Sequence, residues 1–319
     1  MSSREARWSS GRPVLAIALL VGTGASIRSS QYRGQAGDAD RLQFVVVNGV
    51  RLAYRAEGRG VPAVFVHGES HTHELWSRQV EAVRAKYFFV SYDRRGHGQS
   101  DDPITGYSPT AHAEDLNGLM NFLGIADAHF VVNSRGGAVI MQFLRRYPAK
   151  VRSLVLADAT IALADLSETF EAAVRRYSAP PPSLDESLRQ REGRKASSFY
   201  AVARTRPDVK AVLDRMIDQY SPRVAMNPRQ AEDQVSSLDI GPWNEREFPD
   251  MARLAKPVLL VVGEKTDPYF IDGARKAAAA WPRSRLEIIT DADHLLALEA
   301  PEVFNRLILD FFAAVDGQR

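Results

Sequence analysis

One serine in this chain stands where a strand-to-helix turn would present a nucleophile. Ser134 lies in the run Val-Val-Asn-Ser-Arg-Gly-Gly, residues 131–137, directly after an apolar strand pattern and directly before a helical one. A tight turn there exposes the hydroxyl above the sheet, and the next N–H, that of Arg135, can face a developing oxyanion. A serine in this place can equally cap the helix. Taken alone, the pattern does not decide between the two interpretations.

The elements around this serine alternate in type. The domain opens with a predicted hairpin, Leu42–Val47 and Val50–Arg55, joined by Asn48-Gly49, a strong turn signal. Apolar strand-like runs follow at 63–66, 88–92, 130–133, 151–157, 257–262 and 286–289, with helical patterns near 75–85, 111–123, 135–146 and after Pro301. Such alternation predicts an α/β fold, a mostly parallel sheet flanked by helices on both faces.

One long stretch breaks this alternation. Residues 159–255 are helix-like, rich in Arg, Ser and Glu, and interrupted by Ala179-Pro180-Pro181-Pro182 and by Gly241-Pro242-Trp243. We interpret them as a helical cap inserted into a core made of residues 41–158 and 256–319. A cap over the carboxyl ends of parallel strands would shape a substrate pocket there, because open α/β sheets bind ligands at those ends.

Four motifs in this order resemble those of the α/β-hydrolase superfamily over nearly all of residues 42–315, and most closely its serine esterase and cofactor-free haloperoxidase branch. They are His67-Gly68, the turn Tyr92–Ser100, the strand end Val261–Pro268, and Ala292–His294 with Glu299–Asn305. The resemblance implies the α/β-hydrolase fold and a nucleophile elbow at Ser134. In place of the small residue, usually glycine, that the family has two positions before the serine, this chain has Val132, so the turn is expected to be strained or shifted.

The family's chain order implies a triad of Ser134, Asp267 and His294. His294 would take the serine proton and pass it to the leaving group, while Asp267 would fix the imidazole tautomer. Asp158 follows the 151–157 strand, where some family members carry the acid, and is the alternative. Two further carboxylates near the histidine, at positions 291 and 293, are expected to be solvated.

The resemblance also implies an oxyanion hole made by the main-chain N–H groups of Glu69 and Arg135, with His67 bracing the loop. A carboxylate at position 69 is unusual, because negative charge near an oxyanion opposes catalysis. Glu69 could recognise a substrate amine or hydroxyl, or it could pair with an arginine such as Arg94 or Arg135. The run His71-Thr72-His73-Glu74 is not expected to bind a metal, because no second close cluster of ligands accompanies it.

Composition narrows the function classes. Apolar residues make up 45% and charged residues 25%, which are ordinary globular values that argue against a disordered, fibrous or polytopic membrane protein. The net charge is +2 and the basic doublets are scattered, so nucleic acid is not an expected partner. There is no cysteine, which excludes a thiolate nucleophile, a disulfide and a cysteine metal site.

The first 25 residues have the order of a signal peptide. Three arginines within residues 1–12 precede an uncharged apolar run at 14–22 and small residues at 23–25. We expect cleavage after Ala25, a flexible leader over 26–40, export to the periplasm or medium, and no stable membrane insertion afterwards. An uncleaved anchor or a misassigned start codon is the alternative.

These observations favour a serine hydrolase that cleaves a small ester, thioester or lactone through an acyl-enzyme, with a small-molecule substrate and no cofactor. Ser134 argues against epoxide and haloalkane hydrolases of the superfamily, which carry aspartate at this position. Three alternatives stay open: an aminopeptidase of the proline-releasing type, a ligand-binding protein with low turnover, and a cofactor-free oxygenase or perhydrolase. The natural substrate and the oligomeric state are not specified by the sequence.

Overall fold

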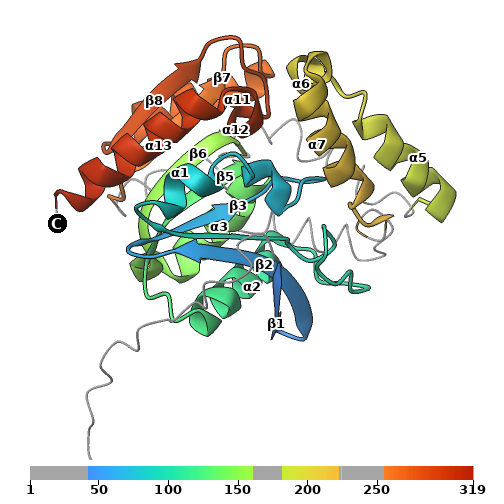
Figure 1. Cartoon of the computed structure of the whole chain (residues 1–319), viewed down its shortest axis with the longest axis horizontal. Coiled ribbons are helices and arrows are strands. Elements are labelled where there is room, and N and C mark those ends of the chain that lie inside the picture. Colours follow the sequence, from blue (N-terminus) through green and yellow to red (C-terminus); the bar gives the residue numbers. More distant parts are fainter. Residues whose placement is uncertain (1–41, 161–181, 223, 225–254, 319) are drawn as a thin grey trace, which may run out of the picture. The chain divides into compact units, whose positions relative to one another are not determined.

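The predicted motif residues lie at the carboxyl ends of the parallel strands of one sheet. The structure, a computed structural model, describes residues 42–160, 182–222, 224 and 255–318. In this part of the chain eight strands form one sheet in the order β1-β2-β4-β3-β5-β6-β7-β8 (Figure 1). The strands are β1 (Gln43–Val47), β2 (Val50–Gly58), β3 (Pro62–Val66), β4 (Phe88–Tyr92), β5 (Ala128–Ser134), β6 (Val151–Ala159), β7 (Val258–Gly263) and β8 (Ser284–Ile289).

Strand pairing confirms the predicted mixture of one hairpin and a parallel sheet. Strands β1 and β2 are antiparallel, as are β2 and β4, and all the remaining pairs are parallel. The hairpin turn is Asn48-Gly49, with φ of 50° and 75°. Left-handed conformation at both central residues matches the right-handed strand twist, which is why Asn-Gly is favoured here.

Two apolar clusters, one on each face of the sheet, form the core. Val64 and Val66 of β3 belong to one cluster, and Ala63 and Phe65 to the other, because alternate residues of a strand point to opposite faces. Figure 1 shows α2 and α3 together on one side of the sheet and α1 and α13 on the other. The core helices are α1 (Val80–Arg84), α2 (Pro109–Phe122), α3 (Gly136–Arg146), α11 (Pro268–Ala280), α12 (Leu296–Glu299) and α13 (Pro301–Asp316).

Residues 182–222 of the segment predicted as the cap form three helices and a 3-10 turn. They are α5 (Leu184–Arg194), η3 (Ser198–Tyr200), α6 (Ala201–Thr205) and α7 (Pro207–Asp218). Leu213 and Met216 of α7 are fully buried in the same cluster as Trp76 of the 3-10 turn η1 (His73–Trp76). Tyr220, which follows α7, also pairs with His97 of the core through an antiparallel bridge. The described cap helices are therefore packed on the core.

Several predictions fall outside the described residues. The signal peptide (1–25) and the leader (26–40) lie there, as do residues 161–181 and 225–254 of the predicted cap. Among the helices of the described ranges, none is both long enough and apolar enough to cross a membrane.

Candidate active site

Ser134 occupies a sharp turn between β5 and α3. Its φ is 51°, in the left-handed region that a residue with a side chain adopts at a cost of about 1 kcal/mol or more. Its main-chain oxygen accepts the N–H of Thr160 at 2.9 Å, which fixes the turn to the next strand. A Cβ on Gly137 would lie 2.4 Å from the Thr160 oxygen, so the turn needs glycine there. The predicted strand, turn and helix around the serine are confirmed.

The valine two positions before the serine does not displace this turn. Val132 is fully buried among the apolar residues of the face that α2, α3 and α11 cover. A glycine is present two positions after the serine instead: a Cβ on Gly136 would lie 2.8 Å from the Val66 oxygen. The expectation of a shifted turn is therefore not met.

The carboxylate that lies against His294 is Asp158. Nδ1 of His294 is 3.7 Å from Oδ2 of Asp158, and both side chains are almost completely buried. This is an ion-pair distance, longer than a hydrogen bond. Asp158 also accepts the Gly263 N–H at 3.4 Å. Burial raises the pKa of the Asp158 carboxyl, and contacts with His294 and Thr266 oppose that rise.

A bulge in β6 places this aspartate. Asn133 pairs with Ala157, but Ser134 pairs with Ala159, so Asp158 is an extra residue without a partner in β5. Its φ of 40° turns its side chain out of the regular alternation. Bulges of this type often redirect a side chain beside an active site.

Asp267, the acid favoured by the resemblance, is placed differently. It is the N-cap of α11, where its Oδ1 accepts the Tyr269 N–H at 2.9 Å, and it is exposed. A carboxylate at a helix N-terminus satisfies an otherwise unpaired N–H and suits the helix dipole. In the described part of the chain, the carboxylate in ion-pair contact with His294 is therefore that of Asp158, the alternative acid, and the identity of the catalytic acid stays a prediction.

The two aspartates beside the histidine also differ from each other. Asp291 is exposed and forms an ion pair with Lys265 at 2.7 Å, as expected for a solvated carboxylate. Asp293 is buried, contrary to that expectation, and accepts the main-chain N–H groups of Ala201 at 3.0 Å and Val202 at 3.5 Å. It thereby fastens the start of α6, in the cap, to the histidine loop.

His294 is held from two further sides. Its main-chain oxygen accepts a hydrogen bond from Nδ2 of Asn133, the residue before the serine, at 3.2 Å. The rings of Phe270 and Phe199 lie with their centroids 4.7 and 5.5 Å from that of the imidazole. The first contact ties the histidine loop to the elbow, and the second gives the imidazole an apolar aromatic surrounding.

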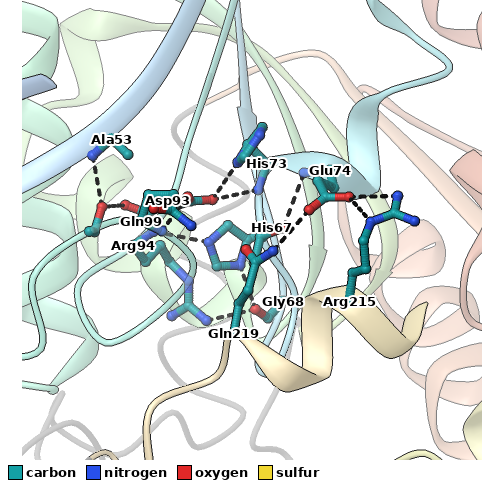
Figure 2. A network of polar contacts seen from close by, with 12 residues as sticks. Ala53, His67, Gly68, His73, Glu74, Asp93, Arg94, Gln99, Arg215 and Gln219 are labelled. Atoms are coloured by element: carbon teal, nitrogen blue, oxygen red, sulfur yellow. Dashed lines mark hydrogen bonds and ion pairs between the residues drawn. The ribbon is translucent and has the colours of Figure 1, made fainter. Parts of the chain in front are cut away.

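The His67-Gly68 loop is braced by the turn after β4. Nδ1 of His67 donates to the Gly68 oxygen at 2.7 Å, and Nε2 accepts the Arg94 N–H at 2.9 Å. Burial lowers the pKa of His67 well below its usual value, consistent with this neutral tautomer. Figure 2 shows the His67 ring between these two groups, with the Arg94 guanidinium reaching the same Gly68 oxygen at 2.8 Å. His67 therefore braces the loop, as its position in the sequence suggests.

This loop lies directly over the serine. A Cβ on Gly68 would be 2.7 Å from Cβ of Ser134, so only glycine permits this approach. Glu69 and Arg135, whose N–H groups are the expected oxyanion donors, follow the two contacting residues. Their side chains meet in an ion pair of 2.8 Å. The oxyanion hole itself remains a prediction.

Glu69 is a member of a charged cluster that joins the core to the cap. Besides Arg135, its carboxylate contacts Arg194 of α5 at 3.3 Å and accepts the Tyr220 hydroxyl at 3.0 Å. The Arg194 guanidinium also stacks over the Tyr220 ring at 5.1 Å. Burial would raise the pKa of Glu69, but the two arginines outweigh it and hold that pKa well below its usual range. The ion pair between Glu69 and Arg135 agrees with the expectation that this carboxylate pairs with an arginine.

The side chains of residues 71–74 contact separate partners. His71 contacts Asn133 and Tyr200, His73 binds Asp93 at 2.9 Å, and Glu74 binds Arg215 of α7 at 2.8 Å (Figure 2). Within the described ranges, no three His, Asp or Glu side chains are grouped to hold a metal ion.

Sequence reasoning overlooked three residues of the site. Asn133 carries a weak signal, a buried amide next to the elbow serine. Tyr200 and Arg194 carry none, because nothing in the pattern of the cap indicates which of its side chains face the core.

A serine on a left-handed strand-to-helix turn, at the sheet edge where a histidine meets a buried aspartate, defines an α/β protein with a nucleophile elbow. The chain belongs to the alpha/beta hydrolase fold family, whose model matches residues 62–301.

Similar proteins cover most of the chain. A non-heme chloroperoxidase, CPO-A1, of Kitasatospora aureofaciens is 27% identical over 275 residues, which are 83% of this chain and 96% of that protein. Est816, described as an N-acyl homoserine lactone degrading enzyme, is 26% identical with a TM-score of 0.65, over 84% of this chain and 100% of its own. A thermophilic esterase from Thermogutta terrifontis is 25% identical with a TM-score of 0.67, over 86% and 99%.

Proposed function

We propose that the protein is a serine hydrolase that cleaves a small ester, thioester or lactone through a triad of Ser134, His294 and Asp158. The observation that carries the proposal is the joint placement of these residues. The serine lies on a strained turn under the His67-Gly68 loop. The histidine is held by the residue before that serine and faces a buried aspartate. Relatives described as an esterase and as a lactone-degrading enzyme support this substrate class.

In the proposed reaction, His294 removes the Ser134 hydroxyl proton as the oxygen attacks the acyl carbon. The imidazolium is stabilised by Asp158, and the oxyanion by the N–H groups of Glu69 and Arg135. Collapse of the tetrahedral species breaks the bond to the leaving group, which takes the proton from His294. Water, deprotonated by the same histidine, then releases the acid and restores the serine.

The cluster at Glu69 weighs against the proline-releasing aminopeptidase. Recognition of a substrate ammonium would require a carboxylate with lone pairs to offer. Glu69 already accepts from Arg135, Arg194 and Tyr220, which occupies three of the roughly four acceptor sites of a carboxylate and balances its charge with two guanidinium groups, so little of it is left for an ammonium.

A second activity is supported by the relative described as a chloroperoxidase. Hydrogen peroxide, attacking the acyl-enzyme in place of water, would give a peracid. Peracid formation from an acyl donor and peroxide, absent in Ser134→Ala, would establish this activity. If peroxide changes neither the rate nor the products of ester turnover, hydrolysis is the only one of the two activities that the protein has.

The test is a matched substrate panel. Purified protein is given 4-nitrophenyl acetate and butyrate, a phenyl thioester, short-chain lactones and prolyl 4-nitroanilide. The proposal predicts ester, thioester or lactone turnover that Ser134→Ala lowers by a factor on the order of 10³ or more, with the anilide far slower. Equal turnover by wild type and Ser134→Ala would contradict the triad, and preference for the anilide would favour the aminopeptidase.

We also propose that residues 1–25 direct export. N-terminal sequencing of the full-length gene product, recovered from a bacterial host, would show a chain that begins near Ser26 in the periplasm or medium. An intact N-terminus in the cytoplasm would contradict export.

A further inference from the structure

The geometry points to a hydrogen-bonded relay of Tyr200, His71 and Asn133 that couples the position of the cap to the position of His294. His71 is the positioning residue of this relay. The inference rests on the proposed function, in which His294 is the base. The three residues take no part in the chemical steps of the proposed reaction. Their hydrogen bonds connect η3 with the histidine loop.

His71 is the centre of this relay. It is fully buried, with Nδ1 at 3.2 Å from Oδ1 of Asn133 and Nε2 at 3.1 Å from the Tyr200 hydroxyl. Burial, with positive charges nearby, lowers the pKa of His71 to about 3, so the ring is neutral and has one N–H. An amide oxygen only accepts, so Nδ1 bears the proton. Nε2 must then accept, and Tyr200 donates to it.

Asn133 passes the contact to the catalytic histidine. Because its Oδ1 faces His71, its Nδ2 is free to donate, and it does so to the main-chain oxygens of Ala157 at 3.1 Å and His294 at 3.2 Å. The relay therefore runs in one direction, from the Tyr200 hydroxyl to His71, to Asn133 and to the His294 main chain. Both hydrogens of the Asn133 amide therefore have a hydrogen-bond acceptor.

The cap end of the relay has a second hold on the same loop. Tyr200 is buried, and the next two residues donate their N–H groups to Asp293, directly before His294. The ring centroids of His71 and Tyr200 lie 6.2 and 6.3 Å from that of His294. Residues 200–202 thus contact the histidine loop directly through Asp293 and indirectly through His71.

The relay also passes beside the nucleophile. A Cβ on Gly68 would lie 2.7 Å from Cβ of Ser134, 3.0 Å from Oδ1 of Asn133 and 3.0 Å from Nδ1 of His71. One glycine therefore separates the elbow, the amide and the imidazole. A change in the His71 contact alters the separation between the serine and its base, which affects the chemical step more than substrate binding.

Three variants test the relay. Tyr200→Phe keeps the ring and removes only the donor to Nε2. His71→Asn places an amide N–H near the position of Nδ1, whereas His71→Gln places its amide near Nε2 and loses the donor to Asn133. Tyr147→Phe is the matched control, because it removes a tyrosine hydrogen bond of 2.6 Å to Glu114, at the far end of α3.

The expected kinetic result is a split between kcat and KM. Tyr200→Phe and His71→Gln lower kcat with the best ester by a factor of about 10–100, while KM stays within about twofold. His71→Asn keeps the donor to Asn133 but loses the acceptor for Tyr200, so its kcat should fall about as far as that of Tyr200→Phe. Tyr147→Phe keeps wild-type kcat. Wild-type kcat in Tyr200→Phe and His71→Gln would overturn the relay, as would a loss that only follows the melting temperature across all four variants.

A spectroscopic readout separates this inference from the proposed function. In ¹⁵N-histidine-labelled protein, His71 should show the neutral tautomer with its proton on Nδ1, and Tyr200→Phe should shift the His294 ring resonances, which His71→Asn and His294→Ala assign. Unchanged His294 resonances, or a proton on Nε2 of His71, would overturn the relay even in an active enzyme. Absence of wild-type turnover with these signals present would instead refute the proposed function and leave the relay standing.

Discussion

Ser134 and Asp158 leave neighbouring parallel strands in the same left-handed conformation, with φ of 51° and 40°. The pairing of β5 and β6 passes directly from Asn133–Ala157 to Ser134–Ala159, so the aspartate bulges out beside the serine turn. Two strained residues with side chains rarely occur so close together unless the surrounding structure requires them. The proposed nucleophile and the proposed acid are therefore both set by one strand pair, and His294 completes the site from a separate loop.

Exchanging each candidate acid for its amide tests this arrangement. Asp158→Asn removes the charge that stabilises the imidazolium, and we expect kcat to fall by a factor on the order of 10³–10⁴. Asp267→Asn should keep kcat within about threefold and leave stability nearly unchanged, because asparagine caps a helix about as well as aspartate. Steady-state ester hydrolysis by both variants is the measurement. A larger loss in Asp267→Asn than in Asp158→Asn would restore the family pattern.

Val132→Gly introduces glycine, the residue usual for the family two positions before the serine. Since Val132 is fully buried, the variant loses packing and leaves a cavity, and we expect the free energy of unfolding to fall by about 2–4 kcal/mol in a urea titration. The turn is already formed with valine, so reactivity per folded molecule should not rise. A tenfold faster acylation in the variant would show that the valine restrains the elbow.

The Glu69 cluster predicts a pH-dependent stability difference. The pKa of Glu69 is held below its usual value, so the stabilisation is complete above about pH 4.5 and is lost as the pH falls further. Glu69→Gln should lower the free energy of unfolding by about 2 kcal/mol at pH 7, and the gap to wild type should narrow toward pH 3. Denaturant titrations of wild type and Glu69→Gln at pH 7 and pH 3 measure this difference in the free energy of unfolding.

The same variant tests substrate recognition. If the carboxylate only pairs with the arginines, Glu69→Gln should affect amine-bearing and neutral esters to the same extent. A loss of kcat/KM confined to amine-bearing esters would show that Glu69 recognises the substrate.

Glu299 predicts the opposite pH trend. It is buried, its Oε2 accepts the Asp293 N–H at 2.6 Å, and its Oε1 lacks a hydrogen-bond partner in the described part of the chain. Burial, with Asp293 and Asp158 nearby, raises the pKa of Glu299 to about 7. The folded state therefore disfavours the charge, and stability falls as the pH rises from about 4.5 to 7 and then levels.

Glu299→Gln removes that charge. We expect it to raise the free energy of unfolding at pH 8 by up to ~3 kcal/mol and to leave it nearly unchanged at pH 4. Thermal melts of wild type and Glu299→Gln at pH 4 and pH 8 measure the difference in stability at each pH. Destabilisation at pH 8 would show that the ionised carboxylate is needed in the folded protein.

Much of this molecule could be predicted from local pattern. Asn48-Gly49 determines a hairpin through backbone preference alone, and Ser134 sits between an apolar run and a helical one, so the strand, turn and helix follow. The acid could not be predicted in the same way. Asp158 and Asp267 both follow buried strands, and only a one-residue bulge in β6, a property of strand pairing, selects the former.

Contacts with the cap were beyond sequence reasoning for a different reason. His71 and Tyr200 are 129 positions apart, and their hydrogen bond depends on how η3 packs on the core. Glu69 likewise meets Arg194 from α5. The choice of partner among many arginines and tyrosines is decided by tertiary packing, which no local preference encodes.

The most direct test of the central claim is covalent labelling of the purified protein with a fluorophosphonate, mapped by peptide mass spectrometry, in wild type, Ser134→Ala, His294→Ala and Asp158→Asn. We expect stoichiometric modification of wild type at Ser134, none in Ser134→Ala, and labelling slowed at least a hundredfold in His294→Ala and Asp158→Asn. Labelling at another residue, or none in a folded wild type, would contradict an activated serine at this elbow.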